Sequence, residues 1–263
     1  MSTILVMGGG VAAMRYIESL LFTQHHLIVC GFGVRRKSEQ LSKFYRLPFC
    51  EFSGLNEQSL SVIDLIIIAT PPVVRLLVID KLINECNYRG AVIIEKPLAM
   101  SYNELDTIMD IIPRIKKCAV ACQRDFNINC YNFIDEYASN YSIKWGTPFE
   151  KYLDNLVHMF PHLASWIMCL SNEILVINHH ADNRLVGRLG STELNVSFMQ
   201  EHSNQGVSIN NRIYPAPNYR LENSKIVQSV LTFTENQTQD NMKRARQVTE
   251  ILISLLKEAG YGH

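Results

Sequence analysis

Three polar side chains occupy positions from which a folded chain could present them to a reacting centre. Lys96 directly follows an apolar run that is typical of a β-strand, and Asp154 lies four residues before His158 in a stretch of helical periodicity. Residues four apart share one face of a helix, so the Asp154 carboxylate can orient or polarise the His158 imidazole. A strand-end ammonium and such an imidazole suit proton transfer that is coupled to hydride transfer. The sequence therefore predicts an acid–base site of Lys96, Asp154 and His158, provided the fold brings them together.

A glycine-rich segment follows the first apolar run of the chain and opens a helical pattern. It matches the dinucleotide-binding fingerprint as Gly8-x-Gly10-x-x-Ala13. Gly8 permits the tight turn, Gly10 lets the backbone approach a pyrophosphate, and Ala13 permits close packing of helix on strand. The first N–H groups of the helix are then available to phosphate oxygens. The residues expected to hold the pyrophosphate are Gly8, Gly10, Val11, Ala12 and Ala13.

The end of the second predicted strand bears on the choice of nucleotide. Enzymes selective for NAD place Asp or Glu there to bind the ribose 2′-hydroxyl, but no carboxylate occurs between Glu18 and Glu39. The segment instead carries side chains that suit a 2′-phosphate, namely Arg35, Arg36, Lys37 and Ser38. A solvated basic start of a helix is the alternative interpretation, although helix N-termini disfavour cations. The sequence predicts NADP(H) in preference to NAD(H).

Further cofactor contacts are expected where later strands end. Ala69-Thr70-Pro71 closes one apolar run, Glu95-Lys96 closes the next, and Gln123 follows the last one. In open parallel sheets, ligands bind at the carboxyl ends of the strands. The expected contacts at this edge are therefore Ala69, Thr70, Pro71, Glu95, Lys96 and Gln123.

The first half of the chain alternates short apolar runs with helical patterns, which indicates a parallel sheet with crossover helices. The run Leu65–Ala69 is apolar on both faces, as a central strand must be. The predicted strands are 3–8, 27–33, 64–69, 90–94 and 117–122, and the predicted helices between them are 11–22, 37–46, 73–86 and 102–112. These elements predict an N-terminal Rossmann dinucleotide-binding domain over residues 1–122.

The pattern changes after Gln123. Thr147 can act as the N-cap of a helix in which Pro148 is the first residue and Glu150 closes a capping box. Pro161 removes a backbone donor and is expected to kink this helix near residue 157.

The other elements predicted for the second half are a helix at 128–140, antiparallel strands at 173–180, 192–198 and 226–233, and an amphipathic helix at 240–258. Alternating apolar and polar residues in the strand candidates suit a sheet that is covered on one face. The predicted fold class is therefore α/β, with a compact C-terminal α+β domain over residues 123–263 built on a mainly antiparallel sheet.

Together these motifs resemble the Gfo/Idh/MocA oxidoreductase family. The matching elements, within residues 1–170, are the glycine loop, Ala69-Thr70-Pro71, Glu95-Lys96-Pro97-Leu98, Gln123-Arg124-Asp125-Phe126-Asn127 and Asp154-x-x-x-His158. The resemblance implies that Lys96, Asp154 and His158 serve the reacting centre and that the Lys96–Pro97 bond is cis, as it often is in that family. The family commonly has an acidic residue three positions after the helix histidine, where this chain has Pro161.

Charge and composition argue against several partners. Lys plus Arg and Asp plus Glu both number 25, so no global field attracts nucleic acid or a membrane surface. No apolar run approaches the ~20 residues of a membrane span, and the chain opens directly on a strand pattern instead of a signal peptide. The seven cysteines are scattered without a Cys-x-x-Cys, which suits reduced, mostly buried thiols of a cytoplasmic protein.

His162 extends the spacing of Asp154 and His158, and three such side chains could in principle bind a divalent metal. Pro161 distorts that helix face, so no metal site is expected. Asp154, His158, His162 and Ser165 follow one another at helical spacing and are expected to form a polar strip along one helix face.

We expect an NADP(H)-dependent oxidoreductase that transfers a hydride to or from a C=N or C=O (C–OH) carbon of a small or carrier-tethered molecule. The basic segment favours NADPH and hence reduction. A sugar or cyclitol dehydrogenase is one alternative, because many members of the family oxidise such hydroxyls. A non-catalytic NADP(H)-binding sensor or partner protein is another, motivated by Pro161 and the short segment between Gln123 and Asp154. The resemblance also implies a homo-oligomer, a dimer formed through the open face of the C-terminal sheet.

Overall fold

The computed structural model describes residues 1–31, 36–121, 140–147, 151–171, 175–181, 183–200, 207–210, 212–214 and 219–261. The chain divides into two compact units. The first comprises residues 1–121 and 219–246, and the second comprises residues 122–218 and 247–263. The domain boundary expected after residue 122 stays a prediction, and the compact units additionally group residues 219–246 with the first sheet.

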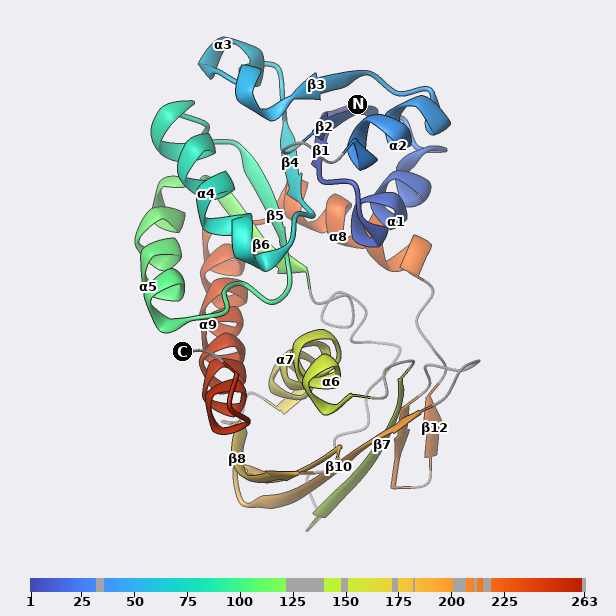
Figure 1. Ribbon diagram of the computed structural model, residues 1–263, viewed down its shortest axis with the longest axis vertical. Coiled ribbons are helices and arrows are strands. Elements are labelled where there is room, and N and C mark those ends of the chain that lie inside the picture. Colours follow the sequence, from blue (N-terminus) through green and yellow to red (C-terminus); the bar gives the residue numbers. More distant parts are fainter. Residues whose placement is uncertain are drawn as a thin grey trace. The chain divides into compact units, whose positions relative to one another are not determined.

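Six parallel strands form the sheet of the first unit, and their order is β3-β2-β1-β4-β5-β6 (Figure 1). The strands are β1 (Thr3–Met7), β2 (His26–Gly31), β3 (Phe49–Glu51), β4 (Leu65–Ile68), β5 (Ala91–Glu95) and β6 (Lys117–Ala121). This is the strand order of the Rossmann fold, and its topological switch point lies between β1 and β4. Every residue of β4 and β5 is buried, which explains why both runs are apolar apart from Glu95 at the end of β5.

Helices cover both sides of this sheet. In Figure 1, α4 (Arg75–Asp80) and α5 (Tyr102–Ile111) lie on one side, and α1 (Val11–Leu20) and α8 (Tyr219–Thr232) lie on the other. The remaining helical segments of this unit are α2 (Lys37–Tyr45), α3 (Glu57–Leu60), the 3₁₀ turns η1 (Phe52–Gly54), η2 (Pro72–Val74) and η4 (Ile112–Arg114), and the π-helical turn η3 (Lys81–Glu85). The single helix expected at 73–86 is therefore η2, α4 and η3 in succession.

The strand expected at 226–233 is wrong, because these residues belong mainly to α8. Ile226, Val227 and Val230 are completely buried. Their spacing is that of a helix face, and α8 packs on α1 and on the strands β5 and β6. The β-branched composition suggested a strand, and the burial of one helical face overrode it.

The second unit contains a six-stranded sheet with the order β12-β11-β7-β10-β9-β8. Its strands are β7 (Asn140–Thr147), β8 (Leu175–Ala181), β9 (Arg184–Leu189), β10 (Thr192–Gln200), β11 (Val207–Ile209) and β12 (Arg212–Tyr214). Neighbouring strands are antiparallel except β7 and β10, which are parallel. The expectation of a mainly antiparallel sheet in the second half is confirmed, as is the α/β fold class.

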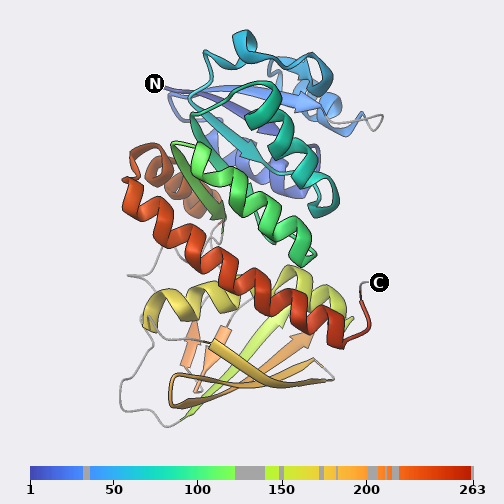
Figure 2. The ribbon, with the colours of Figure 1, turned by 90° about the vertical axis from the view of Figure 1, so that its left-hand side faces the viewer.

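Two helices, α6 (Tyr152–His158) and α7 (Phe160–Ser171), lie over one face of the second sheet (Figure 2). Leu194, Val196 and Phe198 of β10 are buried, whereas the alternating Glu193 and Asn195 are exposed. One face of this sheet is thus covered within the unit, and the opposite face of β10 carries exposed residues.

The expected start of the long helix at Thr147 is wrong. Thr147 is the last residue of β7, and α6 begins at Tyr152 with Lys151 as its N-cap. Residues 148–150 and most of the helix expected at 128–140 lie outside the described residues, and Asn140 already belongs to β7. The β-branched and aromatic residues of 140–147 suit a strand that pairs along its whole length with β10.

The C-terminal helix α9 (Glu235–Glu258) is continuous (Figure 2), and the division between the two units falls inside it, after Arg246. Met242, Val248 and Leu252 are buried, as the amphipathic pattern predicted. No helix within the described part of the chain is long and apolar enough to cross a membrane.

Candidate functional site

The glycine loop lies at the carboxyl end of β1, between the ends of β2 and β4. The Gly8 N–H donates a hydrogen bond to the Cys30 carbonyl oxygen at 3.2 Å. Gly8 has φ +124°, and a Cβ there would lie 2.7 Å from the Ala69 carbonyl oxygen. Both the conformation and the close approach therefore require glycine at this position.

The start of α2 lies directly beside this loop. A Cβ at Gly9 would lie 2.5 Å from the Ser38 backbone nitrogen and 2.7 Å from the Lys37 Cβ. Lys37 and Arg36 are exposed and Ser38 is buried. Lys37 and Ser38, two of the four residues predicted to meet a 2′-phosphate, thus lie next to the glycine loop, and Arg36 directly precedes them in the chain. The fourth, Arg35, lies outside the described residues.

The N-terminus of α1 has the features of an anion site. Gly10 is the N-cap, no side chain caps the helix, and its first turn carries no acidic residue. A Cβ at Gly10 would meet no atom of the described residues within 4 Å, so this part of the chain leaves open space around the glycine. The helix dipole and the first N–H groups favour a phosphate here. Ala13 is completely buried, in agreement with its predicted packing role.

The other predicted cofactor segments reach the same edge of the sheet. Met7 pairs with Ile68 in the β1–β4 ladder, and Ile68 pairs with Ile94 in the β4–β5 ladder. The residues that follow these pairs, Gly8 to Gly10, Ala69 to Pro71, and Glu95 with Lys96, therefore lie at adjacent strand ends. The Lys96–Pro97 peptide bond is cis, as the family resemblance implied.

A buried charged group lies behind this edge. Arg75, the first residue of α4, is 1% exposed, and its Nη2 donates a hydrogen bond to the Thr70 carbonyl oxygen at 2.9 Å. Its Nε and Nη1 atoms have no hydrogen-bond partner among the described residues, and neither has the buried hydroxyl of Thr70. Burial lowers the pKa of Arg75 to about 10, and the charges of Glu95 and Glu104 oppose that shift. The guanidinium therefore stays protonated at neutral pH.

Glu95 is the acidic member of this group and is 7% exposed. Burial raises the pKa of its carboxyl group, while Lys96, Arg75 and a hydrogen bond from the Tyr16 side chain act in the opposite direction. Glu95 is thus surrounded by two cations and a phenol at the base of the segment that carries Lys96. Lys96 itself is half-buried.

Sequence reasoning missed Arg75. The available signal was a single cation inside an apolar run, Val73-Val74-Arg75-Leu76-Leu77. A charge at such a position is almost never fully buried unless it is paired.

In the second unit, Asp154 and His158 both lie on α6 with the predicted separation of four residues. Asp154 is half-buried in the first turn, and His158 is exposed at the last position of the helix. Helical geometry is interrupted at Met159, and Pro161 is the second residue of α7, where a proline is tolerated. The expected effect of Pro161 is therefore confirmed as a break between two helices.

The break also changes the polar strip that was expected to run from Asp154 to Ser165 on one helix. His162 and Ser165 lie on α7, and Ser165 is buried. Among the described residues, no group of three or more His, Cys, Asp or Glu side chains could hold a metal ion.

A buried amide fixes α6 to the edge of the sheet below it. Asn155 is completely buried, and its Nδ2 donates a hydrogen bond to the Asn183 Oδ1 at 3.0 Å. Asn183 has φ +62° in the turn between β8 and β9, and its carbonyl oxygen accepts a hydrogen bond from the Phe198 N–H at 2.8 Å. The helix that carries Asp154 and His158 is thus connected to three strands through one side chain that the sequence did not single out.

The structure therefore brings the described cofactor residues of the first unit to one edge of the Rossmann sheet. Gln123 lies outside the described residues. Lys96 belongs to the first unit, and Asp154 and His158 belong to the second. Their meeting at one reacting centre stays a prediction.

Solved structures of similar fold span almost the whole chain. A dehydrogenase (MviM) from Clostridium difficile shares 15% sequence identity, with a TM-score of 0.73 over 98% of this chain and 99% of that one. A Gfo/Idh/MocA family oxidoreductase from Vibrio cholerae shares 14%, with a TM-score of 0.71 over 99% and 100%. A myo-inositol dehydrogenase from Corynebacterium glutamicum shares 12%, with a TM-score of 0.71 over 99% and 98%. At these identities the likeness shows the fold.

No curated protein sequence matches the chain. The family model described as "Oxidoreductase family, NAD-binding Rossmann fold" matches residues 2–139. That match covers more than half of the 263 residues and contains the glycine loop and Glu95-Lys96-Pro97. The chain belongs to the Gfo/Idh/MocA family of NAD-binding oxidoreductases.

Proposed function

We propose that this protein is an NADP(H)-dependent oxidoreductase that transfers a hydride between the nicotinamide and a C=N or C=O (C–OH) carbon. The observation that carries the proposal is the arrangement of adjacent strand ends in the first unit. The glycine loop follows β1, Thr70 follows β4, and Lys96 follows β5, with β1, β4 and β5 paired side by side. A nucleotide held by the loop would extend along this edge toward the Lys96 side chain.

The residues present fit a pyridine nucleotide. The uncapped start of α1 and the open space at Gly10 suit the pyrophosphate. The buried Thr70 hydroxyl, which has no partner among the described residues, offers a further hydrogen bond at the same edge. When bound, the nucleotide supplies or accepts the hydride, and the protein supplies orientation and proton transfer.

The preference for NADP(H) is supported by the segment beside Gly9. Lys37 and Arg36 present cationic side chains to solvent there, and Ser38 adds a hydroxyl, with no carboxylate before Glu39. Glu39 itself forms an ion pair with Lys43 at 2.6 Å, so its carboxylate is directed along α2 and not toward a ribose 2′-hydroxyl. A 2′-phosphate would gain charge-assisted hydrogen bonds at this position.

For the proton, we assign His158 as the acid–base group and Asp154 as the residue that orients its imidazole. Lys96 would donate a hydrogen bond to the reacting oxygen or nitrogen and could share the proton transfer. Glu95 and Arg75 would act through Lys96 and Thr70 by fixing the strand ends that carry them. This assignment requires the two units to bring residues 96 and 158 to the same carbon atom.

The substrate we favour is a C=N or C=O group on a small or carrier-tethered molecule, reduced by NADPH. The basic residues beside Gly9 support this direction. A sugar or cyclitol dehydrogenase is the second candidate, and the structural likeness to a myo-inositol dehydrogenase favours it. Oxidation of cyclitols and sugars with NADP⁺, set against reduction of ketones and cyclic imines with NADPH, separates the two.

The decisive experiment compares the wild-type protein with Lys96→Ala and His158→Ala. NADPH binding is followed by fluorescence titration, and turnover by absorbance loss with a panel of carbonyl and imine substrates. We expect His158→Ala to bind NADPH like the wild type, and both variants to have a kcat lower by roughly 10²–10⁴-fold, which is the range for a positioned acid–base group. NADPH binding without turnover by the wild-type protein on any panel would instead support a non-catalytic sensor.

We also propose that the protein forms a homodimer through the outer face of the second sheet. Val186 of β9 and Met199 of β10 are large apolar side chains that are exposed on this sheet (39% and 40%). Val186→Glu and Met199→Glu should shift the sedimentation coefficient from dimer to monomer. Val62→Glu, which alters an exposed apolar residue of the first unit, is the matched control.

A further inference from the structure

Two cysteines are direct neighbours across the parallel strands β2 and β3. Cys30 and Cys50 are Cα partners in this ladder, and both are free thiols. Partners in a ladder project their side chains to the same face of the sheet. The Cys30 thiol donates a weak hydrogen bond to the Gly31 carbonyl oxygen at 3.8 Å.

The ladder spacing is compatible with a disulfide that is slightly strained. Adjacent strands lie about 4.7–4.9 Å apart, which is within the Cα–Cα range of about 4.4–6.8 Å for disulfides. The Cβ atoms of a disulfide lie about 3.8 Å apart, closer than ladder partners usually are, so the bond would draw the two strands together locally. Strained disulfides have higher reduction potentials and are readily reduced, as reversible redox pairs must be.

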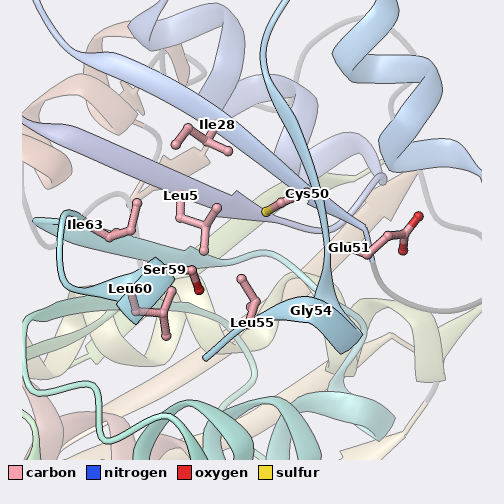
Figure 3. Close-up of a pocket in the computed structure, with 9 residues that line it drawn as sticks. All are labelled: Leu5, Ile28, Cys50, Glu51, Gly54, Leu55, Ser59, Leu60 and Ile63. Atoms are coloured by element: carbon pink, nitrogen blue, oxygen red, sulfur yellow. The ribbon is translucent and has the colours of Figure 1, made fainter. Parts of the chain in front are cut away.

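The two thiols differ in accessibility. Cys30 is completely buried, whereas Cys50 is half-buried and lines a cavity of about 190 Å³. Figure 3 shows the Cys50 side chain among the residues that line this cavity, which include Leu5 and Ile28. One water occupies about 30 Å³ of liquid, so the cavity can admit a small hydroperoxide.

The electrostatics of the pair favour Cys50, the more accessible thiol, as the first of the two to react. Interaction with the neighbouring Cys30 thiol lowers the pKa of Cys50, and interaction with Cys50, together with burial, raises the pKa of Cys30. The thiolate is the reactive form of cysteine, so Cys50 is the sulfur that reacts first.

We propose that Cys30 and Cys50 are a reversible dithiol–disulfide pair that a hydroperoxide oxidises and that acts on the glycine loop. The Cys50 thiolate attacks the terminal oxygen of the hydroperoxide, the O–O bond breaks, and the departing oxygen takes a proton to leave as water or an alcohol. Cys50 is then a sulfenic acid. The Cys30 sulfur attacks the Cys50 sulfur, the S–O bond breaks, and the oxygen leaves as water with the Cys30 proton. Two electrons pass from the two sulfurs to the hydroperoxide.

The link to the glycine loop is the backbone of Cys30. Its carbonyl oxygen accepts the hydrogen bond from the Gly8 N–H, and Cys30 is the ladder partner of Met7, the residue before the loop. A Cβ at Gly31 would lie 2.6 Å from the Phe49 ring, so β2 and β3 are already tightly packed beyond the pair. Because β2 lies between β1 and β3, a disulfide that draws Cys30 toward β3 pulls its carbonyl oxygen away from Gly8. This consequence for nucleotide binding rests on the proposed function.

The first test detects the bond itself in the full-length protein. Trypsin separates residues 16–35 from residues 47–75, and each peptide contains a single cysteine, Cys30 or Cys50. After treatment with hydrogen peroxide, we expect these two peptides to be joined in non-reducing mass spectra and to separate again with dithiothreitol. In the Cys30→Ser variant, Cys50 should be trapped by dimedone as a sulfenic acid. The buried Cys118, whose pKa burial raises to about 12, should remain a free thiol.

Unjoined peptides, with Cys50 no more reactive than Cys118, would overturn the proposal. The second measurement compares NADPH affinity before and after oxidation. Loss of one hydrogen bond at the loop should weaken binding about fivefold in the wild type and leave Cys50→Ser unchanged. A disulfide that forms without this change refutes the coupling to the loop. Failure of the reduced protein to bind any pyridine nucleotide refutes the proposed function, while the peptide result still decides the thiol pair.

Discussion

The Arg75 guanidinium donates a hydrogen bond to the Thr70 carbonyl oxygen across the turn that joins β4 to α4, at 2.9 Å. Both residues are almost completely buried, and Arg75 also interacts electrostatically with Glu95 at the end of the neighbouring strand. One side chain thus connects the segment before Pro71 with the segment that carries Lys96. Burying a cation at this position costs desolvation energy. We therefore infer that Arg75 is retained because it fixes the ends of β4 and β5 relative to each other.

Replacing Arg75 with Met should destabilise the protein and loosen the turn at Thr70. The Thr70 carbonyl would lose its donor inside the protein, which costs about 1–3 kcal/mol of unfolding free energy. Urea unfolding measures that loss, and a weaker affinity for NADPH should accompany it. Lys43→Met, at an exposed ion pair of α2, is the surface control and should change stability by less than about 0.5 kcal/mol. Equal effects of both variants would contradict the role given to Arg75.

Gly10→Ala separates nucleotide binding from folding. Among the residues that the structure describes, the new Cβ would meet no atom within 4 Å, and Gly10 has φ −88°, which alanine adopts without strain. Stability should therefore change by less than about 1 kcal/mol, the difference between glycine and alanine at a helix N-cap. A pyrophosphate that approaches this backbone would collide with the methyl group, and NADPH affinity should fall roughly tenfold or more.

The matched control is Gly54→Ala, because a Cβ at Gly54 also meets no atom of the described part of the chain within 4 Å. It should leave both the free energy of unfolding and the NADPH dissociation constant, measured by isothermal titration calorimetry, unaltered. If Gly10→Ala binds NADPH as tightly as Gly54→Ala does, the nucleotide does not lie over the start of α1.

Periodicity alone predicted most of the Rossmann sheet, because each of its central strands is buried on both faces and is therefore mainly apolar. It could not predict β3, since Phe49–Glu51 is only three residues long and is a strand through its pairing with β2. The helix α8 was missed for a related reason. Ile226, Val227 and Val230 have the composition of a strand, and only their packing on distant elements shows the helical face.

The residues of the candidate site likewise fall into two groups, those that could be predicted from the sequence and those that could not. Motifs with a fixed local geometry, the glycine loop and Glu95-Lys96-Pro97, could be placed from the sequence because strand ends and loops are adjacent along the chain. Arg75 and Asn155 could not, since their importance depends on burial and on partners in other elements. A kink near residue 157 was predicted from Pro161, whose chemistry does not depend on context, and the structure has a break at Met159.

The basic segment predicts a difference between the two nucleotides. Arg36→Gln with Lys37→Gln removes two cations beside Gly9 and should weaken NADPH binding roughly tenfold or more, since a hydrogen bond to a charged group contributes about 1.5–3 kcal/mol. NADH lacks the 2′-phosphate, and its affinity should be nearly unchanged. Titrations at two ionic strengths provide a second readout, because only the NADPH complex of the wild type should weaken with salt. Lys43→Gln on the same helix is the control. A parallel loss for both nucleotides would argue against recognition of the phosphate.

Asn155→Leu should reduce turnover without reducing nucleotide binding. The amide is completely buried and donates to Asn183 at 3.0 Å, so its loss leaves a polar partner unsatisfied at a cost of about 1–3 kcal/mol. The helix α6 would then hold His158 less firmly, and kcat should fall while the NADPH dissociation constant stays the same. Asn195→Leu, at an exposed position of β10, serves as the control. An unchanged kcat at measurable loss of stability would show that α6 does not position the acid–base group.

Glu95→Gln should stabilise the protein at neutral pH while it impairs catalysis. Burial raises the pKa of the Glu95 carboxyl above the 4.5 of an unperturbed glutamate, despite the opposing charges of Lys96 and Arg75. Between the unfolded and folded pKa values, the native state binds more protons than the unfolded state. The free energy of unfolding of the wild type therefore falls as pH rises through this interval, and the loss is complete above the folded pKa. Glutamine resembles the protonated carboxyl and escapes that loss.

Urea unfolding should consequently give similar stabilities for the two proteins at about pH 4 and a more stable variant at about pH 8, since the difference depends only on ionisation of Glu95. The kcat of Glu95→Gln should fall at the same time, because Lys96 loses the neighbouring carboxylate that helps to orient its ammonium. A variant that is less stable than the wild type at about pH 8 would show that attraction to Arg75 and Lys96 outweighs the cost of burying the carboxylate. In that case the ionised Glu95 stabilises the strand end as an ion-pair partner. The same carboxylate would then favour both the stability of the protein and the orientation of Lys96.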